Sequence, residues 1–512
     1  MGELGQSRAA LKDDWVGTWA MAPRGDGTAF NDQTLRQVVH TSIGGTSVRV
    51  RLSNAFGNQP LSIDNVHVAE RASGASIVPQ TDQTLKFAGQ GTATISAGQS
   101  LTSDAVTFAV KPLADLVVSF HIQNNPGGTT AHGTGLQDNY IASGNVAGNE
   151  TLNGAQTKGN YFFLTNVDVQ NAAAWGAVVT LGASITDGVA SGGNDNRRWP
   201  NDLAKRLSDM KIPVGVLNEG ISGNKLLVDG AGESALKRFD RDVLSQPGVR
   251  WVIFSDDPIN DLGSGNPPSG AQLIDGLKQL VKNAHDNGIE FWCSTLTPYE
   301  GSGGWKPEGE TARAAIISFI KQPDSGCDKI VDQDTATHDP TKPTWFLPAN
   351  DAGDHLHPNE KGLQAIADAV PLSGFTAPAG NGGSGGAGGS EAMAGSAGMA
   401  GAATAAAGGA SAGAPATGGT GGVGGGSAGG NSASGSDGVL NGSAGTSGMA
   451  GGGTTAAGGG GASPTPTDSS CSCRTPGSPA SPERDLATLA LSLGLASSIF
   501  ARRRRSVRIS GR

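Results

Sequence analysis

The sequence predicts an α/β fold in its central part, an all-β domain before it and a disordered Gly/Ala/Ser linker after it. Three stretches with different patterns support this division. Short β-type runs separated by Gly, Pro, Asn and Ser cover residues 14–166, strand-like and helix-like runs alternate over residues 173–375, and residues 376–463 are almost entirely small. Strand–helix alternation is typical of a parallel sheet with helices on both faces.

Length and composition restrict the possible classes of protein. The chain has 512 residues, 81 of them Gly, and a formal net charge of −9. This acidic balance argues against nucleic acid as the main partner. Four cysteines are too few for a disulfide framework, and none shows a zinc-type spacing with histidines. We expect Cys293 and Cys327, which lie in the folded part, to be free thiols; a bond between them is the alternative for an exported protein.

The segment 14–166 has the pattern of a β-sandwich of the jelly-roll type. Residues 48–52 alternate with period two after the turn pair Gly44-Gly45, and residues 116–122 form another strand-like run. His132 and Asp138 could face a ligand there, but such loop side chains are usually solvated. Residues 1–13 contain no basic-then-apolar signal peptide.

In the α/β part we expect five strands and five helices. The strand-like runs are 177–183, 213–218, 250–256, 289–296 and 329–333, and the helix-like runs are 199–210, 234–244, 270–287, 308–321 and 359–370. In open α/β sheets the ligand lies beyond the carboxyl ends of the strands, so the residues that follow each strand should carry the chemistry.

The stretch 181–188, Leu-Gly-Ala-Ser-Ile-Thr-Asp-Gly, follows the first strand and holds the first candidate, Ser184. A serine hydroxyl needs a base to take its proton. His357 can be that base, and Asp354 can hold its tautomer and stabilise the imidazolium. Backbone N–H groups near Ser184 and at Gly220, with the side-chain amide of Asn260, can stabilise an oxyanion. His355 is a rival base, but we expect that it and His357 do not both point at the serine.

Ser184, Gly220, Asn260 and His357, in this order and spacing, resemble the SGNH/GDSL hydrolase superfamily. The similarity extends to a two-domain, xylan-esterase-like bacterial branch through residues 15–19 (Trp-Val-Gly-Thr-Trp), 197–200 (Arg-Arg-Trp-Pro), 238–242 (Arg-Phe-Asp-Arg-Asp) and 354–358 (Asp-His-Leu-His-Pro). It covers residues 14–375. The resemblance implies a three-layer α/β/α, flavodoxin-like fold with strand order 2-1-3-4-5. It also implies ester hydrolysis without a metal or other cofactor.

The chain departs from the family pattern at two motifs. Gly-Asp-Ser is Gly-Ala-Ser here, with Ala183 before the serine, and Gly-x-Asn-Asp begins with Pro258. Asp256 and Asp257 end a predicted strand that we expect to be apolar or to carry one acid. Since proline fixes φ and removes an N–H, the loop that directs Asn260 could differ from that of the family.

The C-terminal part predicts a flexible linker and an anchoring segment. Residues 376–463 cannot bury enough apolar surface to fold. In residues 464–512, Cys471 and Cys473 are followed by an apolar run, 486–501, that is short for a membrane span, and by four arginines, 502–505. This segment resembles the C-terminal sorting signal of myxobacterial surface proteins, which implies an extracellular or cell-surface location.

These observations lead to two functional hypotheses. The first is a serine esterase, expected to be monomeric, that removes short acyl groups, above all acetyl, from small esters or polysaccharides through an acyl-enzyme on Ser184. The second is a non-catalytic carbohydrate-binding or adhesion protein with a degenerate hydrolase domain. The changes at Ala183 and Pro258 favour the second, and the intact Ser–His–Asp set favours the first. A lipase lacks support because the sequence shows no long apolar lid.

Overall fold

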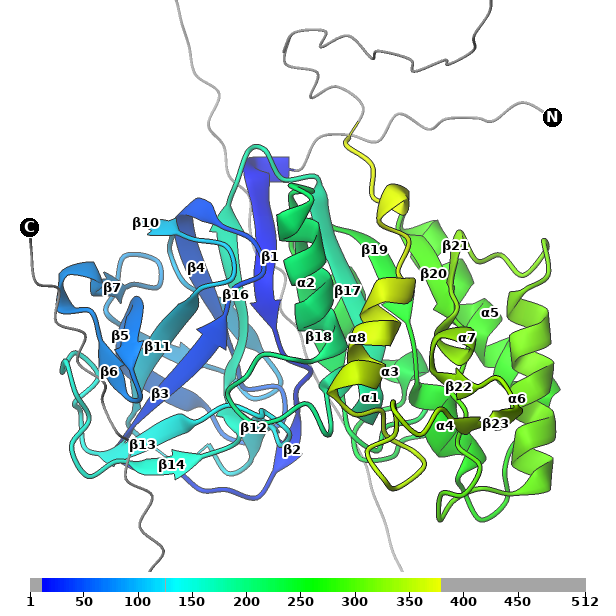
Figure 1. Ribbon diagram of the computed structural model, residues 1–512. Coiled ribbons are helices and arrows are strands. Elements are labelled where there is room, and N and C mark those ends of the chain that lie inside the picture. Colours follow the sequence, from blue (N-terminus) through cyan, green and yellow to red (C-terminus); the bar gives the residue numbers. More distant parts are fainter. Residues whose placement is uncertain (1–11, 125, 379–512) are drawn as a thin grey trace, which may run out of the picture. The chain divides into compact units, whose positions relative to one another are not determined.

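The computed structural model describes residues 12–124 and 126–378, which all belong to one compact unit (Figure 1). The predicted linker, apart from its first residues 376–378, and the predicted C-terminal segment lie outside the described residues. Within the two described ranges, no helix has both the length and the apolar character that crossing a membrane requires.

Residues 15–170 form antiparallel sheets, as the β-type pattern predicts. A five-stranded sheet has the order β1-β16-β4-β10 with β9 on β4, an eight-stranded sheet has the order β14-β13-β3-β11-β5-β6 with β7 and β8 on β5, and β15-β12-β2 form a third sheet. The strands are β1 (Trp15–Ala20), β2 (Arg24–Asp26), β3 (Gln33–His40), β4 (Gly45–Ser53), β5 (Leu61–Ser73), β6 (Ser76–Ile77), β7 (Gln83–Leu85), β8 (Thr92–Ile95), β9 (Ser100–Thr102), β10 (Val106–Val110), β11 (Asp115–Ile122), β12 (Thr129–His132), β13 (Asn139–Ser143), β14 (Gln156–Lys158), β15 (Tyr161–Phe162) and β16 (Leu164–Gln170). Alternate residues of β4 and β11, among them Val48, Val50, Leu116 and Val118, share one apolar core.

Residues 176–378 contain a five-stranded parallel sheet of order β18-β17-β19-β20-β21, which is the expected order 2-1-3-4-5. Its strands are β17 (Gly176–Gly182), β18 (Val214–Gly220), β19 (Val249–Phe254), β20 (Glu290–Ser294) and β21 (Lys329–Val331), and β22 (His338–Asp339) with β23 (Lys342–Phe346) makes a small hairpin. The α-helices are α1 (Ser184–Asp187), α2 (Trp199–Asp209), α3 (Ala235–Phe239), α4 (Asp257–Leu262), α5 (Gly270–Asp286), α6 (Pro307–Ile320), α7 (Gln333–Thr337) and α8 (Glu360–Ala369). Short 3-10 helices lie at Lys12–Asp14, Pro79–Thr81 and Leu372–Gly374.

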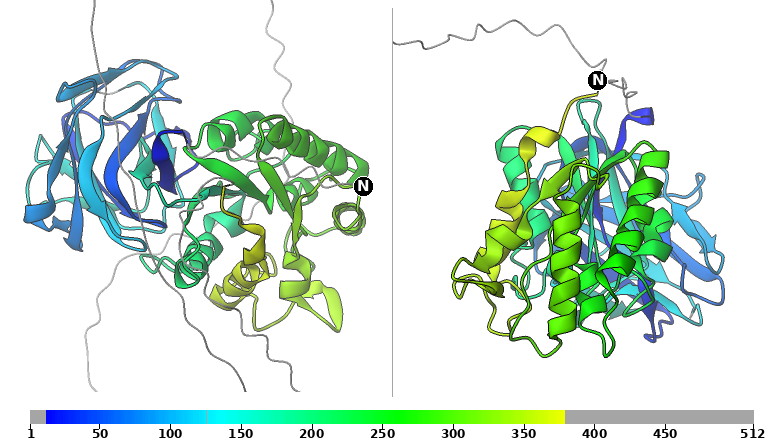
Figure 2. Two further views of the ribbon diagram at one scale, coloured as in Figure 1. Left: turned by 90° about the horizontal axis from the view of Figure 1, so that it is seen from above. Right: turned by 90° about the vertical axis from the view of Figure 1, so that its right-hand side faces the viewer.

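Helices cover both faces of this parallel sheet (Figure 2). Successive strand residues point to opposite faces, so each strand supplies two cores. Val178, Trp251 and Trp292 pack with α2 and α8, whereas Val179, Val252 and Phe291 pack with α3, α5 and α6. Both faces of the sheet are therefore covered, and a ligand site would lie at the carboxyl ends of its strands.

Two sequence expectations about these elements are wrong. The predicted helix 234–244 is interrupted, because α3 ends at Phe239 and a π-helical turn follows at Asp240–Leu244. The predicted strand 250–256 ends at Phe254, and Asp256 instead precedes α4, a helix that the apolar pattern did not indicate. The two acids therefore do not belong to a strand at all.

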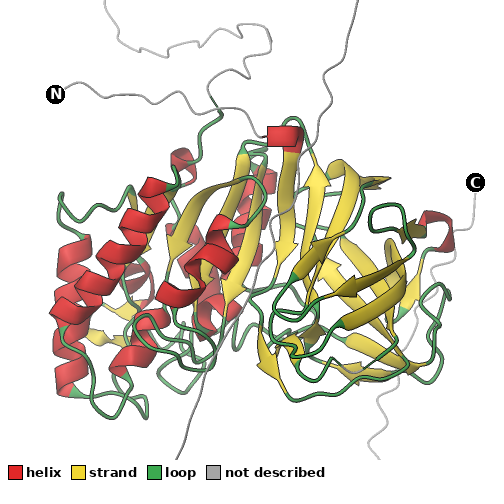
Figure 3. Ribbon diagram, turned by 180° about the vertical axis from the view of Figure 1, so that it is seen from behind, coloured by secondary structure: helices red, strands yellow, loops and turns green. Residues whose placement is uncertain are grey.

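The β-sheet domain packs directly on β18, the edge strand of the parallel sheet (Figure 3 shows strands of both parts). The side-chain hydroxyl of Ser42 accepts a hydrogen bond from Val216 N–H at 2.9 Å, and Gly17 N–H donates to Pro247 O at 3.0 Å. A Cβ at Gly215 would lie 2.1 Å from Gly17 O, so only glycine permits this approach. His132, expected to be solvated, is also buried here, while Asp138 accepts a hydrogen bond from Asn194.

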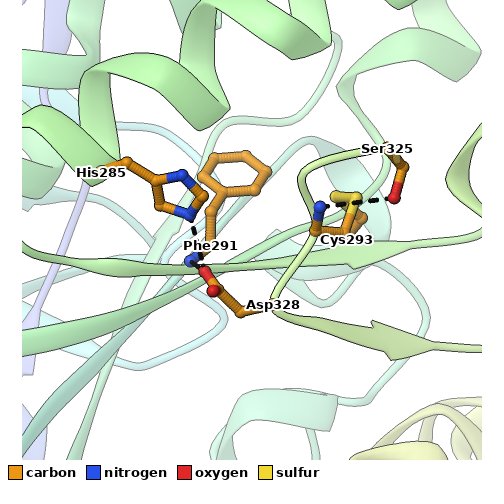
Figure 4. The surroundings of a disulfide bond; sticks show 6 residues. His285, Phe291, Cys293, Ser325 and Asp328 are labelled. Carbon is orange, nitrogen blue, oxygen red and sulfur yellow. Dashed lines mark hydrogen bonds and ion pairs between the residues drawn. A yellow bond between two sulfur atoms is a disulfide. The ribbon is translucent and has the colours of Figure 1, made fainter. Parts of the chain in front are cut away.

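A disulfide joins Cys293 of β20 to Cys327, so the expectation of free thiols is wrong (Figure 4). Because β20 and β21 are parallel neighbours, the residues just before β21 lie beside β20, and the two Cα atoms are 5.6 Å apart. Asp328, the next residue, accepts hydrogen bonds from Phe291 N–H at 2.7 Å and from the ring of His285 at 2.8 Å. The bond therefore lies in a region that is already held together by polar contacts.

Candidate active site

Ser184 lies at the turn between β17 and α1, at the carboxyl edge of the parallel sheet. The residue is only 9% exposed. Its backbone N–H is the first of α1, where a helix has no internal acceptor, and no hydrogen bond from this group to another described residue is found. The turn thus presents both a hydroxyl and an N–H donor that is free to bind a ligand.

The buried carboxylate of Asp256 holds this turn in place. One oxygen accepts hydrogen bonds from Ala183 N–H at 3.0 Å and from the Thr186 hydroxyl at 2.6 Å, and the other accepts from Ile185 N–H at 2.7 Å. The sequence indicated only that two acids at the end of this predicted strand were unexpected. The structure shows that a carboxylate lies beside the turn of Ser184 although residue 183 is alanine.

His357 lies between Ser184 and Asp354. Its Nε2 is 2.9 Å from Ser184 Oγ, and its Nδ1 is 2.6 Å from Asp354 Oδ2. The other oxygen of Asp354 accepts hydrogen bonds from the backbone N–H groups of Leu356 and His357, at 3.0 and 2.9 Å. With Nδ1–H donated to the carboxylate, Nε2 is left to accept the serine proton. The structure thus brings together the three residues that the sequence pointed to.

Local structure fixes the loop that carries this pair. Asn359 caps α8, because its side-chain oxygen accepts hydrogen bonds from Lys361 and Gly362 N–H. Its amide also donates to the carbonyls of Ala349 and Asp351, at 3.0 Å each. The cap therefore ties the start of the helix to the start of the loop that carries Asp354 and His357.

Asp354 remains ionised although it is partly enclosed. Burial alone would raise the pKa of its carboxyl, but the hydrogen bonds from His357 and Leu356 outweigh this and hold the pKa below its ordinary value. The side chain is 53% exposed, so solvent also reaches it. A negative charge is thus available to stabilise a protonated His357.

His355, the rival base, is engaged elsewhere. Its Nδ1 lies 2.5 Å from Asp351 Oδ2, and its ring packs edge-on against Trp345 with centroids 5.2 Å apart. No hydrogen bond joins it to Ser184 among the described residues. Its backbone φ of 58° turns the chain between the two histidines, which separates the directions of their side chains.

Gly220 does not meet its expected role as an oxyanion donor. Its N–H donates to the side-chain oxygen of Asn218 at 2.9 Å, and a Cβ there would lie 2.4 Å from Asp187 N. Gly220 is therefore a packing glycine at the end of β18. Gly223, in the turn that follows, is exposed, has a φ of 80°, and its N–H donates to no described residue. The sequence signal for it was present, since both glycines lie in the block 218–224.

Asn260 lies in α4, and a hydrogen bond to a backbone carbonyl fixes the orientation of its side-chain amide. Its Nδ2 donates one hydrogen bond to Asn224 O at 2.8 Å, which leaves the second N–H of that group. Pro258 occupies the first turn of α4, where the missing N–H would have had no helical acceptor anyway. The proline is thus compatible with the helix that carries Asn260.

A fully buried arginine joins the strand ends beneath the site. Arg238 donates to Gly182 O at 3.0 Å and to Glu219 O at 2.7 Å, and it pairs with Asp242 at 3.1 Å. Asp257 lies 3.6 Å away, and burial raises its pKa to about 7 in spite of this guanidinium. Arg238 therefore fixes the carboxyl ends of β17 and β18 relative to each other.

Comparison with known proteins finds a similarity in the part of the chain that carries this site. Residues 178–370 match the GDSL-like lipase/acylhydrolase family. No curated protein matches the chain. Similar solved structures include a lipase/acylhydrolase from Enterococcus faecalis (19% identity, TM-score 0.30, 38% of this chain and 92% of that chain) and a GDSL-like lipase from Bacteroides thetaiotaomicron (17%, 0.29, 38% and 84%). A variant of an acetyl xylan esterase from Geobacillus stearothermophilus is also similar (21%, 0.30, 38% and 93%). Residues 178–370 are thus similar to GDSL-like lipases/acylhydrolases, and this stretch contains the parallel sheet and the candidate site.

Proposed function

We propose that this protein is a serine esterase that removes short acyl groups, chiefly acetyl, from small esters or polysaccharides. The observation that carries the proposal is the hydrogen-bonded series Ser184–His357–Asp354, with distances of 2.9 and 2.6 Å. A nucleophile, a base and an orienting carboxylate in this order are what acyl transfer to serine requires. The acetyl preference rests on the resemblance to xylan-esterase-like enzymes.

Acylation begins when Ser184 Oγ attacks the ester carbonyl carbon and His357 Nε2 takes the hydroxyl proton. The carbonyl oxygen becomes an oxyanion as the tetrahedral intermediate forms. The intermediate collapses, the bond to the alcohol oxygen breaks, and His357 returns the proton to the departing alkoxide. An acyl-enzyme on Ser184 and a free alcohol result.

Deacylation repeats these steps with water. The water oxygen attacks the acyl carbon while His357 takes a proton from the water molecule. His357 then protonates Ser184 Oγ as the ester bond to the enzyme breaks. The oxyanion of both intermediates would be stabilised by Ser184 N–H and the second N–H of Asn260, and by Gly223 N–H in place of Gly220. Each of these groups is unengaged by other described residues.

An extracellular or cell-surface location is part of this proposal. The disulfide Cys293–Cys327 supports it, since such bonds persist mainly in oxidising compartments. The predicted C-terminal sorting segment is the second reason.

A colorimetric acetate-ester assay tests the proposed activity. Ser184→Ala and His357→Ala should each lower kcat by about 10⁴- to 10⁶-fold, because they remove members of one catalytic unit. His355→Ala is the matched control and should retain most of the activity, since this ring contacts Asp351 instead of Ser184. A wild-type chain without turnover would favour the non-catalytic carbohydrate-binding or adhesion protein, and a severe loss in His355→Ala alone would show that the base is wrongly assigned.

A further inference from the structure

Asp187 ends the short helix that Ser184 begins, and its side chain is 3% exposed. One oxygen accepts a hydrogen bond from the ring of His132 at 2.9 Å. The other accepts two hydrogen bonds from Ser222, from the backbone N–H at 2.9 Å and from the hydroxyl at 2.6 Å. The esterase mechanism uses none of these groups directly, yet they link two active-site segments.

Ser222 immediately precedes Gly223, the proposed oxyanion donor. The carboxylate of Asp187 therefore connects the helix of the nucleophile to the turn of an oxyanion donor through one side chain. Arg198 strengthens the arrangement, because its Nε donates to Asp187 O at 2.8 Å. A change in the position of Asp187 would move Ser184 and Gly223 relative to each other.

His132 belongs to β12, in the β-sheet domain, and is 6% exposed. Its Nδ1 lies 3.0 Å from Ala22 O, and its Nε2 faces Asp187. A carbonyl and a carboxylate both accept hydrogen bonds, and a neutral imidazole can donate from only one nitrogen. The arrangement is satisfied when the ring carries two protons and a positive charge, which balances the buried charge of Asp187.

The surrounding charges agree with an ionised Asp187. Burial alone would raise the pKa of its carboxyl, but the charge and hydrogen bond of His132, the hydrogen bond of Ser222 and the charge of Arg198 together lower it. A buried carboxylate in this state is stable only while its partners remain.

Two neighbours of His132 reach the same active-site segments. The Thr134 hydroxyl donates to Ser222 Oγ at 3.1 Å, and Gly135 O accepts a hydrogen bond from Arg198. Segment 132–135 of the β-sheet domain therefore contacts both the nucleophile helix and the turn before Gly223.

We propose that His132 and Asp187 form a positioning pair across the two domains, through which the β-sheet domain sets the geometry of the esterase site. This inference rests on the proposed esterase function. Oxyanion donors must lie within a few tenths of an ångström of their target, and displacement of about 1 Å can cost 100-fold in rate. The β-sheet domain is then a part of the catalytic unit.

The test compares His132→Gln with His121→Gln in the full chain. His121 is a matched control, since it lies in the same domain with Asp64 and Asp32 on its two ring nitrogens, away from Ser184 and Ser222 in every described contact. We expect His132→Gln to lower kcat about 10- to 100-fold with little change in KM, because substrate binding is retained while transition-state contacts are lost. His121→Gln should match the wild type. A kcat within twofold of wild type in His132→Gln overturns the proposal.

Two further measurements cover the case in which His132→Gln does not fold. Thr134→Val removes only the hydrogen bond to Ser222 and should lower kcat several-fold at unchanged melting temperature; an unchanged kcat counts against the proposal. NMR of the wild-type chain with ¹⁵N-labelled histidine should show a proton on Nε2 of His132 that is hydrogen-bonded to Asp187, and an Nε2 without a proton would overturn the pair. A wild-type chain without turnover would end the esterase proposal too, whereas turnover that survives His132→Gln ends only this inference.

Discussion

Asn260 shows how a single amide contributes to the proposed chemistry. Its Nδ2 is held by Asn224 O at 2.8 Å, so the remaining N–H has a fixed direction at no further entropic cost. We expect Asn260→Ala to lower kcat by about 10²- to 10³-fold and to change KM little, because this donor matters most in the transition state. Steady-state kinetics on an acetate ester measures both constants. Unchanged kcat would mean that Asn260 does not reach the oxyanion.

Asp202, in the first turn of α2, should make stability depend on pH. It is 7% exposed, one of its oxygens has no partner among the described residues, and burial raises its pKa to about 6 although Arg197 opposes this. The native carboxyl therefore binds a proton more tightly than the unfolded one, whose pKa is about 3.9. Through this group, the free energy of unfolding falls as pH rises from about 4 to about 6 and stays low above that.

Asp202→Asn removes this ionisation. The free energy of unfolding of the variant relative to wild type should be higher at pH 7 than at pH 4 by about 1–2 kcal/mol, since only the wild type has a buried charge at the higher pH. Urea denaturation at the two pH values measures the difference, and all other titrating groups cancel in the comparison. An equal difference at both pH values would contradict the prediction.

At the scale of elements, the disulfide between β20 and the segment before β21 closes the loop that contains α6. The closed loop spans a sequence separation of 34 residues, so the bond restricts the unfolded chain considerably. Replacement of Cys293 and Cys327 by serine should lower the free energy of unfolding by about 3–4 kcal/mol. Urea denaturation of the double variant checks this magnitude.

Peptide mapping without reductant tests the bond itself. We expect one cross-linked peptide that contains Cys293 and Cys327 in protein exported to an oxidising compartment. Two free thiols at these positions in such protein would contradict the assignment.

At the scale of the whole molecule, residues after 378 should be dispensable for catalysis. Residues 376–463 contain few large apolar side chains that could pack on the rest of the chain. A chain that ends at Pro378 should therefore have the kcat/KM and melting temperature of the full chain. Side-by-side ester assays and thermal melts measure both, and lost activity would show that the C-terminal part supports the fold.

Unlike the residues after 378, the β-sheet domain should be required for catalysis. It covers the edge strand β18 through Ser42 and Gly17, and it places His132 against Asp187. Separation of the two domains would expose an open strand edge and leave a buried carboxylate without its partner. We therefore regard residues 12–378 as the smallest unit that can be studied as an enzyme.

The sequence by itself determined the parts of the fold that depend on periodicity and the parts of the site that depend on residue type. Apolar runs such as 177–183 predict strands because a doubly covered sheet needs apolar side chains on both faces. Ser184, His357 and Asp354 were identified because each has the required chemistry and follows a predicted strand or precedes a predicted helix. The order of the parallel strands came from the family resemblance, and the structure agrees with it.

Only the tertiary structure decided which polar groups already have hydrogen-bond partners and which residues contact one another. Gly220 and Gly223 are the same residue type. Which of them is the proposed oxyanion donor depends on whether its backbone N–H already has a hydrogen-bond partner. The role of Asp256 depends on contacts with residues 183–186, and that of His132 on a contact with Asp187. Cys293 and Cys327 form a bond because two strands are neighbours in space. Hydrogen-bond satisfaction and proximity are properties of the folded chain, so no local pattern in the sequence could supply them.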